Sequence, residues 1–336
     1  SAVPKCWTKP KKRSPSLFGK QMTRCLKNPF PQTTPEILGA MFDLQQYLLR
    51  YQLTINNKIL EFLKADDHSN RVLKAMRYSI SAGGKRIRPI LALAAAEATH
   101  AQVSDVLPAA CDIEMIHTYS LIHDDLPAMD DDTLRRGKPT SHVQYDEATA
   151  ILAGDALLTF AFEILSSTKD SASENLSRDV KIIRVLAKAA GYQGMIQGQM
   201  QDIQAEGNKL DLDELITMHS LKTGALIEAA VDVGALFGNS GQEKMHALRS
   251  YARHIGLAFQ VIDDMLNVSG DPAKLGKAVG SDMDKGKNTF PGLMGMTNAT
   301  AYAENLVQTA LKSLELFDNK ADPLRAIARY IIDRRS

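Results

Sequence analysis

The 336-residue sequence predicts an all-α protein. Ala, Leu, Ile and Met dominate its apolar residues, and these residue types favour helices over strands. From residue 36 onward the apolar positions recur at intervals of three and four, which is the period of amphipathic helices. No stretch has the alternation and the residue types of a convincing strand. A chain of this length and polarity can bury a large core.

The expected helices follow one another with glycine, proline or polar segments between them. The first covers 36–63, where the helical period is unbroken. A second helix ends at Gly83 and Gly84, and a third begins with Pro89 in its first turn, as these residues prefer at helix ends. Residues 270–292 are rich in Gly, Lys and Asp and predict a loop or broken helix before a final helical stretch. The long helices between these parts are expected at 107–126, 144–169, 177–203, 211–238 and 242–268.

The sequence predicts two parts of unequal order. Residues 1–35 hold eight Lys or Arg residues, six prolines and no acidic residue. Such a basic, proline-rich tail cannot bury enough apolar surface to order itself, so it is expected to be disordered or loosely docked. A remnant of an organelle-targeting leader is the alternative. Residues 36–336 contain no linker and predict a single helical domain.

Composition also bears on the compartment and on the partners. The net charge of +1 gives the whole protein no field that would draw it to nucleic acid or to an anionic membrane. No unbroken apolar run reaches the length of a membrane span. An odd number of cysteines without metal-site spacing favours a reducing compartment. We therefore expect a soluble intracellular protein, cytoplasmic by default, with the matrix of a mitochondrion or plastid as the alternative that the basic tail suggests.

A first acid cluster lies in "LIHDDLPAMDDDTLRRG", which begins at residue 121. Asp124 and Asp130 are six residues apart, so on an unbroken helix they would point about 240° away from each other. Pro127 lies between them and interrupts the helical hydrogen bonds. A bulge at Pro127–Ala128 would bring Asp130 back beside Asp124. The following Asp131 and Asp132 fit a solvated helix end.

A second acid cluster lies in "FQVIDDMLN", at 259–267. Asp263 and Asn267 are i and i+4 and share one helix face, with Asp264 next to them. Carboxylates converge either as an acid/base pair or as ligands of a hard divalent cation such as Mg²⁺. The basic residues of the nearby loops favour the second possibility, because a polyphosphate ligand needs them and an acid/base pair does not. These basic residues are Lys85, Arg86, Arg88, Arg135, Arg136, Lys138, Lys222, Lys277, Lys285 and Lys287.

The ordered motifs of the chain resemble those of the trans-isoprenyl diphosphate synthases. The motifs are "GGKRIRP", "HTYSLIHDDLPAMDDDTLRRGKPTSH", "AGDALL", "GQMQDI", "KTGALIEAAV", "FQVIDDMLNVSGDPAKLGK" and "GKNTFPGLMG". The resemblance covers about 40–336. It implies an isoprenoid-synthase-like helical bundle around a deep central cavity, usually assembled as a homodimer. It also implies Mg²⁺-dependent head-to-tail (1'-4) condensation of isopentenyl diphosphate with dimethylallyl or geranyl diphosphate, releasing diphosphate.

The resemblance also implies a role for each matching residue. Three Mg²⁺ ions per active site, for which Mn²⁺ can substitute, would be held by Asp124, Asp125, Asp130, Asp263 and Asp264, the last in support. The allylic diphosphate would be bound by Arg135, Lys222, Lys277 and Lys287. Isopentenyl diphosphate would be bound by Lys85, Arg88, His117 and Arg136, with Arg334 or Arg335 as a cap. The allylic cation would be steadied by Lys222, Thr223 and Gln260, with Gln199 and Asp202 at the cavity.

Product length is expected to depend on the residues just before Asp124. Tyr119 and Ser120 precede it by five and four positions, where they would form the floor beneath the growing tail. A tyrosine there would stop elongation at the farnesyl length. This aromatic residue together with the Pro-Ala insertion resembles the bacterial-type farnesyl diphosphate synthases, with geranylgeranyl diphosphate synthases as the close alternative. Tyr119 could instead be an ordinary packing residue.

Asn267 departs from the pattern, because the family usually has a third aspartate there. An amide oxygen remains a ligand but has no charge, so the affinity for metal at this corner should fall. The substitution leaves open a divergent terpene cyclase or a weakly active synthase subunit. The complete set for isopentenyl diphosphate argues against a cyclase, and the intact first acid cluster argues against a subunit.

Overall fold

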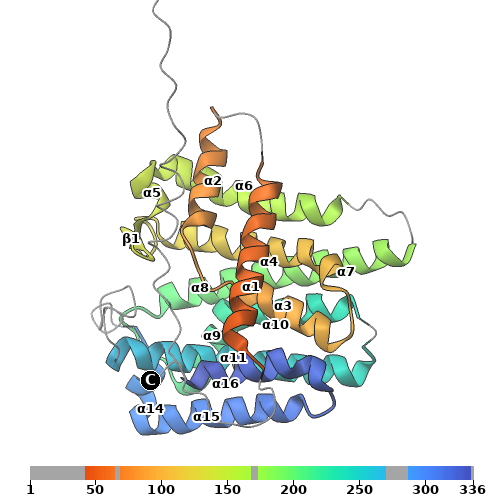
Figure 1. Cartoon of the computed structure of the whole chain (residues 1–336). Coiled ribbons are helices and arrows are strands. Elements are labelled where there is room, and N and C mark those ends of the chain that lie inside the picture. Colours follow the sequence, from red (N-terminus) through yellow and green to blue (C-terminus); the bar gives the residue numbers. More distant parts are fainter. Residues whose placement is uncertain (1–41, 65–68, 168–172, 239, 270–286, 334–336) are drawn as a thin grey trace, which may run out of the picture. The chain divides into compact units, whose positions relative to one another are not determined.

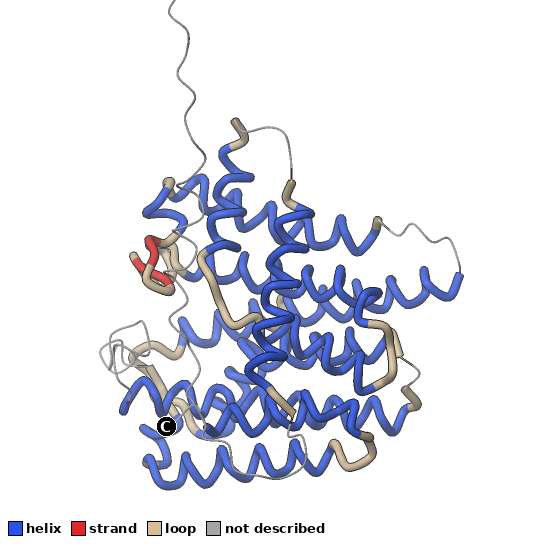
Figure 2. The backbone as a smooth tube through the Cα atoms, viewed as in Figure 1, coloured by secondary structure: helices blue, strands red, loops and turns tan. Residues whose placement is uncertain are grey.

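Helices make up almost all of the structure, a computed structural model that describes residues 42–64, 69–167, 173–238, 240–269 and 287–333. This confirms the all-α prediction (Figure 2). One small antiparallel hairpin, which the sequence did not predict, pairs β1 (Leu134–Arg135) with β2 (Lys138–Pro139). Several predictions lie outside the described residues. They concern the tail 1–35 and the residues Lys277, Lys285, Arg334 and Arg335.

The described helices follow in the predicted order, in one unit of the chain. Up to the hairpin they are α1 (Leu44–Phe62), α2 (Arg71–Ser81), α3 (Ile87–Ala98) and α4 (Val103–Asp124). After it come α5 (Ser141–Gln144), α6 (Glu147–Ser166), α7 (Ser173–Ala190), α8 (Met195–Gln204) and α9 (Leu212–His219). A π-helical turn (Ser220–Gly224) leads into α10 (Ala225–Leu236) and α11 (Gln242–Ser269). The last are α14 (Phe290–Met294), α15 (Met296–Ser313), a 3₁₀ turn (Asn319–Ala321) and α16 (Asp322–Asp333).

Side-chain caps set several of the helix starts. The helix expected from residue 36 begins at Leu44, because the Asp43 carboxylate accepts the backbone N–H of Gln46. At α9, Asp211 and Glu214 form a reciprocal capping box.

The core lies where α3, α4 and α10 pack against one another. α3 is buried on nearly every face, which its alanine-rich sequence allows. In Figure 1, α11, α15 and α16 run side by side below these helices, while α6 lies above them. This packing brings α4 and α11, which carry the two acid clusters, to the same core.

Two predicted long helices are interrupted. The expected helix 177–203 is two helices, because a turn at Gly191–Gly194 brings the chain so close to α7 that a β-carbon on Gly194 would lie 2.2 Å from the Ala189 carbonyl oxygen. The expected helix 211–238 contains the π-helical turn. A β-carbon on Gly198 would lie 2.1 Å from the backbone nitrogen of Lys222, so α8 packs directly on this turn. The close packing fixes the backbone that carries Lys222 and Thr223.

One described helix, α6, is long and apolar enough to cross a bilayer by length and composition alone. Core helices of globular proteins meet the same criterion, and α6 packs against α4. Asp155 and Glu163 interrupt its apolar sequence.

Candidate active site

The chain reverses at the end of α4 and brings the first acid cluster together. α4 ends at Asp124, and the backbone N–H of Asp130 donates to the Asp124 carbonyl oxygen at 2.8 Å. The N–H of Asp131 bonds to the Leu126 carbonyl in the same turn. Asp130 therefore returns beside Asp124, as predicted. It does so because the helix ends before Pro127, whereas the sequence had suggested a bulge in a continuing helix.

Among the described residues, no basic side chain forms an ion pair with Asp124 at this turn. Burial raises its pKa to about 6, and the neighbouring Asp130 and Asp125 add to the rise while Lys222 opposes it. Its carboxylate makes no hydrogen bond with another side chain in the described part of the chain. Crowded hard oxygen donors of this kind fit Mg²⁺.

Asp125 has a different environment from Asp124. It is buried, and the Arg135 Nε donates to both of its oxygens at 2.7 and 2.9 Å. Burial works against the charge of Arg135, but the bonds to Asp125 outweigh it and raise the Arg135 pKa. Arg135 also lies 3.5 Å from Asp132. For Asp125 to ligate a metal, or for Arg135 to bind phosphate, this pair would have to open.

Two predicted cations converge on the first acid cluster from other elements. The Lys222 Nζ, from the π-helical turn, lies 2.6 Å from an Asp202 oxygen of α8. The Lys287 Nζ lies 3.4 Å from Asp130 and 3.6 Å from Asp202. Burial alone would raise the pKa of Asp202, but Lys222 and Lys287 lower it overall. The site therefore alternates acidic and basic side chains.

The second acid cluster lies on α11. Asp263 is half-buried, and its charge acts on Arg88. Burial lowers the pKa of Arg88, and the negative charges of Glu114 and Asp263 offset only part of this effect. Asp264 is buried and accepts the backbone N–H of Phe290 at 3.0 Å. Asn267 lies one turn after Asp263, on the same face, as predicted.

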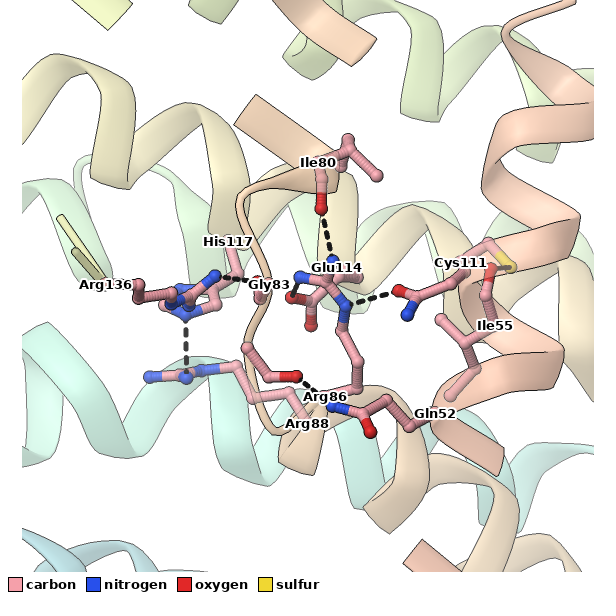
Figure 3. Close-up of polar contacts among 12 residues, drawn as sticks. Gln52, Ile55, Ile80, Gly83, Arg86, Arg88, Cys111, Glu114, His117 and Arg136 are labelled. Carbon is pink, nitrogen blue, oxygen red and sulfur yellow. Dashed lines mark hydrogen bonds and ion pairs between the residues drawn. The ribbon is translucent and has the colours of Figure 1, made fainter. Parts of the chain in front are cut away.

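Three of the four residues predicted for isopentenyl diphosphate come together, as Figure 3 shows. The Arg88 Nη1 and the His117 Nε2 are 3.2 Å apart. Burial, reinforced by Arg88 and Arg136, lowers the pKa of His117 well below its usual value, so the neutral ring accepts from Arg88. Arg136 donates to the Gly83 carbonyl (Figure 3). Its guanidinium lies where a β-carbon on Gly84 would be. The fourth residue, Lys85, lies 5.7 Å from the ring of Tyr330.

Arg86 does not belong with the phosphate-binding cations, contrary to the sequence grouping. It is buried, and its Nη1 lies 2.6 Å from a Glu114 oxygen (Figure 3). It also donates to the Asn56 side chain and to the Ile80 carbonyl. Arg86 has φ of +54°, an uncommon conformation that these bonds stabilise. The pair holds the loop that presents Lys85 and Arg88. Glu114, which the sequence analysis missed, gave no local signal of this role.

The predicted floor residues lie on α4. Tyr119 is 6% exposed, and its ring lies 5.8 Å from the His123 ring in an edge-on arrangement. Burial and the Asp124 charge raise its pKa to about 12. The Ser120 hydroxyl bonds to the His117 carbonyl of its own helix.

Of the three remaining predicted residues, one lies on the π-helical turn and one on α11, while Gln199 is half-buried on α8. Thr223 is buried, and Gln260 is half-buried one turn before Asp263.

Among the described residues, no three His, Cys, Asp or Glu side chains are gathered closely enough to hold a metal without other ligands. Mg²⁺ sites in enzymes that bind phosphates commonly use one or two carboxylates, water and the substrate phosphates. The arrangement of Asp124 and Asp130 beside Lys222 and Lys287 fits that kind of site.

Comparisons with known proteins agree with this chemistry. The polyprenyl synthetase family model matches residues 69–327. The farnesyl diphosphate synthase of Haemophilus influenzae is 46% identical over 291 residues, which are 84% of this chain and 97% of the relative. The large subunit 1 of the heterodimeric chloroplastic geranylgeranyl pyrophosphate synthase of Arabidopsis thaliana is 44% identical over 88% of this chain and 81% of its own. The crystal structure of an FPP/GFPP synthase from Zymomonas mobilis is 39% identical, with a TM-score of 0.76 over 86% of this chain and 98% of that one.

These matches cover most of the chain and most of each relative. Enzymes of this kind are generally Mg²⁺-dependent. The resemblance seen in the motifs is confirmed, and the chain belongs to the polyprenyl synthetase family of prenyltransferases.

Proposed function

We propose that this prenyltransferase condenses isopentenyl diphosphate with dimethylallyl and geranyl diphosphate and releases farnesyl diphosphate as its main product. The observation that carries the product length is the buried Tyr119, five residues before Asp124 on α4. Its bulk beside the acid cluster would close the path of a longer tail. Geranylgeranyl diphosphate is the alternative, since relatives at similar identity carry both names.

In this proposal, Asp124, Asp130 and Asp263 would hold Mg²⁺ for the allylic diphosphate. When bound, Mg²⁺ supplies positive charge that favours the departure of diphosphate. Asp125 joins the ligands only if Arg135 turns to the diphosphate, and Asp264 supports Asp263.

Other side chains bind and orient the two substrates. Lys222, Lys287 and Arg135 would bind the allylic diphosphate, since they lie beside Asp202, Asp130 and Asp125. Lys277 is assigned to the same role from its sequence motif alone. Isopentenyl diphosphate would bind the second basic set, in which neutral His117 accepts a hydrogen bond from Arg88 through Nε2 and adds no charge. The carbonyl of Lys222 and the polar groups of Thr223 and Gln260 steady the allylic cation. The alkene of isopentenyl diphosphate would attack this cation to form the new 1'-4 carbon–carbon bond, and the released diphosphate would take the proton that the resulting cation loses as the new alkene forms.

We also propose that the active form is a homodimer. Large apolar side chains are exposed on neighbouring helices: Ile151 (43%) and Leu152 (54%) on α6, and Leu176 (48%) and Val180 (64%) on α7. A second copy would cover them. Sedimentation of the purified chain at twice its monomer mass would support this assembly, whereas a monomer would point to a different partner subunit.

A product assay tests the proposed function. The purified chain is incubated with labelled isopentenyl diphosphate and each allylic diphosphate, with Mg²⁺ or with EDTA, and the dephosphorylated alcohols are separated by length. Farnesol that requires metal is the expected product. Geranylgeraniol would agree with a prenyltransferase but contradict the proposal that Tyr119 limits the product length. Released hydrocarbon, or no elongation, would favour the cyclase or the inactive-subunit alternative.

Tyr119→Ala is expected to shift the main product from farnesyl to geranylgeranyl or longer diphosphates, because it removes the ring that would end the cavity. Chromatography of the alcohols gives the product distribution. Tyr192→Ala is the matched control, since Tyr192 is 74% exposed and its loss should leave the products unchanged. An unaltered product from Tyr119→Ala would show that Tyr119 is only a packing residue.

Asn267→Asp is expected to lower the Mg²⁺ concentration for half-maximal activity by about tenfold, the effect of roughly 1.4 kcal/mol from one added charge beside Asp263. A titration of initial rates against Mg²⁺ measures it. Asn305→Asp adds the same charge at an exposed position of α15 and should leave the midpoint in place. Equal midpoints in both variants and the wild type would place Asn267 outside the metal site.

A further inference from the structure

Lys287 lies between two parts of the site that come from distant segments. Its Nζ is 3.4 Å from Asp130 of the first acid cluster and 3.6 Å from Asp202 of α8. A lysine side chain is long and flexible, so its backbone must be held for the ammonium group to stay there.

The residue after Lys287 is bound to the turn that follows α8. The Asn288 amide nitrogen donates to the carbonyl of Asn208 at 2.8 Å and to that of Ala205 at 3.4 Å. Its amide oxygen accepts the backbone N–H of Leu210 at 3.0 Å. One side chain therefore crosslinks the segment of Lys287 to the end of α8, which carries Asp202.

The same segment is bound on its other side to α11. The buried Asp264 carboxylate accepts the backbone N–H of Phe290 at 3.0 Å. Phe290 is fully buried, and its ring stacks on that of His219 with 5.5 Å between centroids. The Thr289 hydroxyl caps α14 by accepting the N–H of Gly292. The three residues after Lys287 are thus fixed from α8, from α11 and from their own helix.

We propose that Asp264 and Asn288 are positioning residues that fix Lys287 in the diphosphate site, and that Asp264 contributes to turnover through the Phe290 N–H and Lys287. This inference rests on the proposed function of Lys287 and specifies how Asp264 supports the second acid cluster. In this proposal Asp263 is the metal ligand of the pair, while Asp264 keeps the side chain of Lys287 in place. The first acid cluster has a parallel arrangement, in which Asp125 holds Arg135 directly.

The variants Asp264→Asn and Asp264→Ala distinguish the positioning of Lys287 from metal ligation by Asp264. Asp264→Asn keeps an oxygen that can accept the Phe290 N–H, and it removes the charge that a metal ligand supplies. We expect its kcat/KM for geranyl diphosphate to exceed that of Asp264→Ala by about tenfold, because the anchor on the Phe290 N–H is kept. Asp264→Ala removes the acceptor, and we expect a loss of about 10- to 100-fold, the usual cost of a group displaced by about an ångström. Asp263→Asn is the matched control and should be severely impaired.

Asn288→Ala tests the second anchor without touching either acid cluster. It should lower kcat/KM for geranyl diphosphate as Asp264→Ala does, with the Mg²⁺ midpoint unchanged in both variants. Each change should add little to Lys287→Ala, because all three variants remove the same interaction. Multiplicative losses in the double variants, or a raised Mg²⁺ midpoint in Asp264→Asn, would overturn the proposal.

Amide hydrogen exchange tests the hydrogen bond between Asp264 and the Phe290 N–H without measuring activity. In Asp264→Ala, peptides that contain Phe290 should exchange faster than in the wild type, while in Asp264→Asn they should remain protected. Equal protection in the wild type and Asp264→Ala would overturn the proposal. A wild type that forms no prenyl product would instead reject the proposed function, and the exchange result would still report whether the anchor exists.

Discussion

Asp124→Ala is expected to lower kcat by about 10³-fold or more, since metal-assisted departure of a leaving group contributes several kcal/mol. The reason lies in the geometry at the end of α4. Asp124 is half-buried beside Asp130 and makes no side-chain hydrogen bond or close ion pair among the described residues, so it is the carboxylate best placed for a cation. Initial rates with geranyl diphosphate at saturating Mg²⁺ measure the loss.

Asp131→Asn is the control for this experiment. Asp131 belongs to the same acid run, is exposed, and has a φ of +52° that asparagine tolerates well. Its activity should stay close to that of the wild type. Full activity in Asp124→Ala, or an equal loss in both variants, would remove the assignment of Asp124 to the metal.

Asp112→Asn is expected to stabilise the protein, and the gain should grow with pH. Asp112 is fully buried in α4, and neither carboxylate oxygen has a hydrogen-bond partner within the described part of the chain. Burial raises its pKa well above the usual value, so the folded state keeps a proton that the unfolded state loses above about pH 3.9. From that pH upward, until the folded carboxyl ionises, stability falls by up to about 1.4 kcal/mol per pH unit.

Urea unfolding of the wild type and Asp112→Asn from about pH 4 upward measures this slope. The variant should lack the part of the slope that Asp112 contributes. Asp112→Ala removes the unsatisfied polar group and should gain about 2 kcal/mol at pH 8. Asp155→Asn removes an exposed carboxylate and should change stability by less than about 0.5 kcal/mol at any pH in this range. Parallel pH profiles for the wild type and Asp112→Asn would contradict the prediction.

Local signals in the sequence predicted much of the fold. The three- and four-residue period predicted the order of the helices, and Pro127 predicted that Asp130 would return to Asp124. The interruption at Gly194 and the π-helical turn were missed. Both depend on how closely one helix approaches another, as at Gly198 and Lys222, and periodicity within a single helix carries no record of that distance.

The candidate site was predictable in its residue types and less so in its pairings. The family motifs identified Arg88, His117 and Arg136, and the structure brings them together. Arg86 looked the same as its neighbours in sequence, yet its partner Glu114 is 28 residues away and buried. Asn288 was missed for a similar reason, since its three partners belong to another loop.

The alternation of charge in the site has a consequence for selectivity. Arg135, Lys222 and Lys287 each face a carboxylate of the protein, so their positive charge is already balanced. A bare anion must then displace carboxylates that are left without counter-charge, which is costly in a partly buried site. When an anion arrives together with a divalent cation, the protein carboxylates can bind the cation while the basic side chains bind the anion. We therefore expect the site to bind a diphosphate together with its divalent cation more tightly than free diphosphate or a monovalent anion.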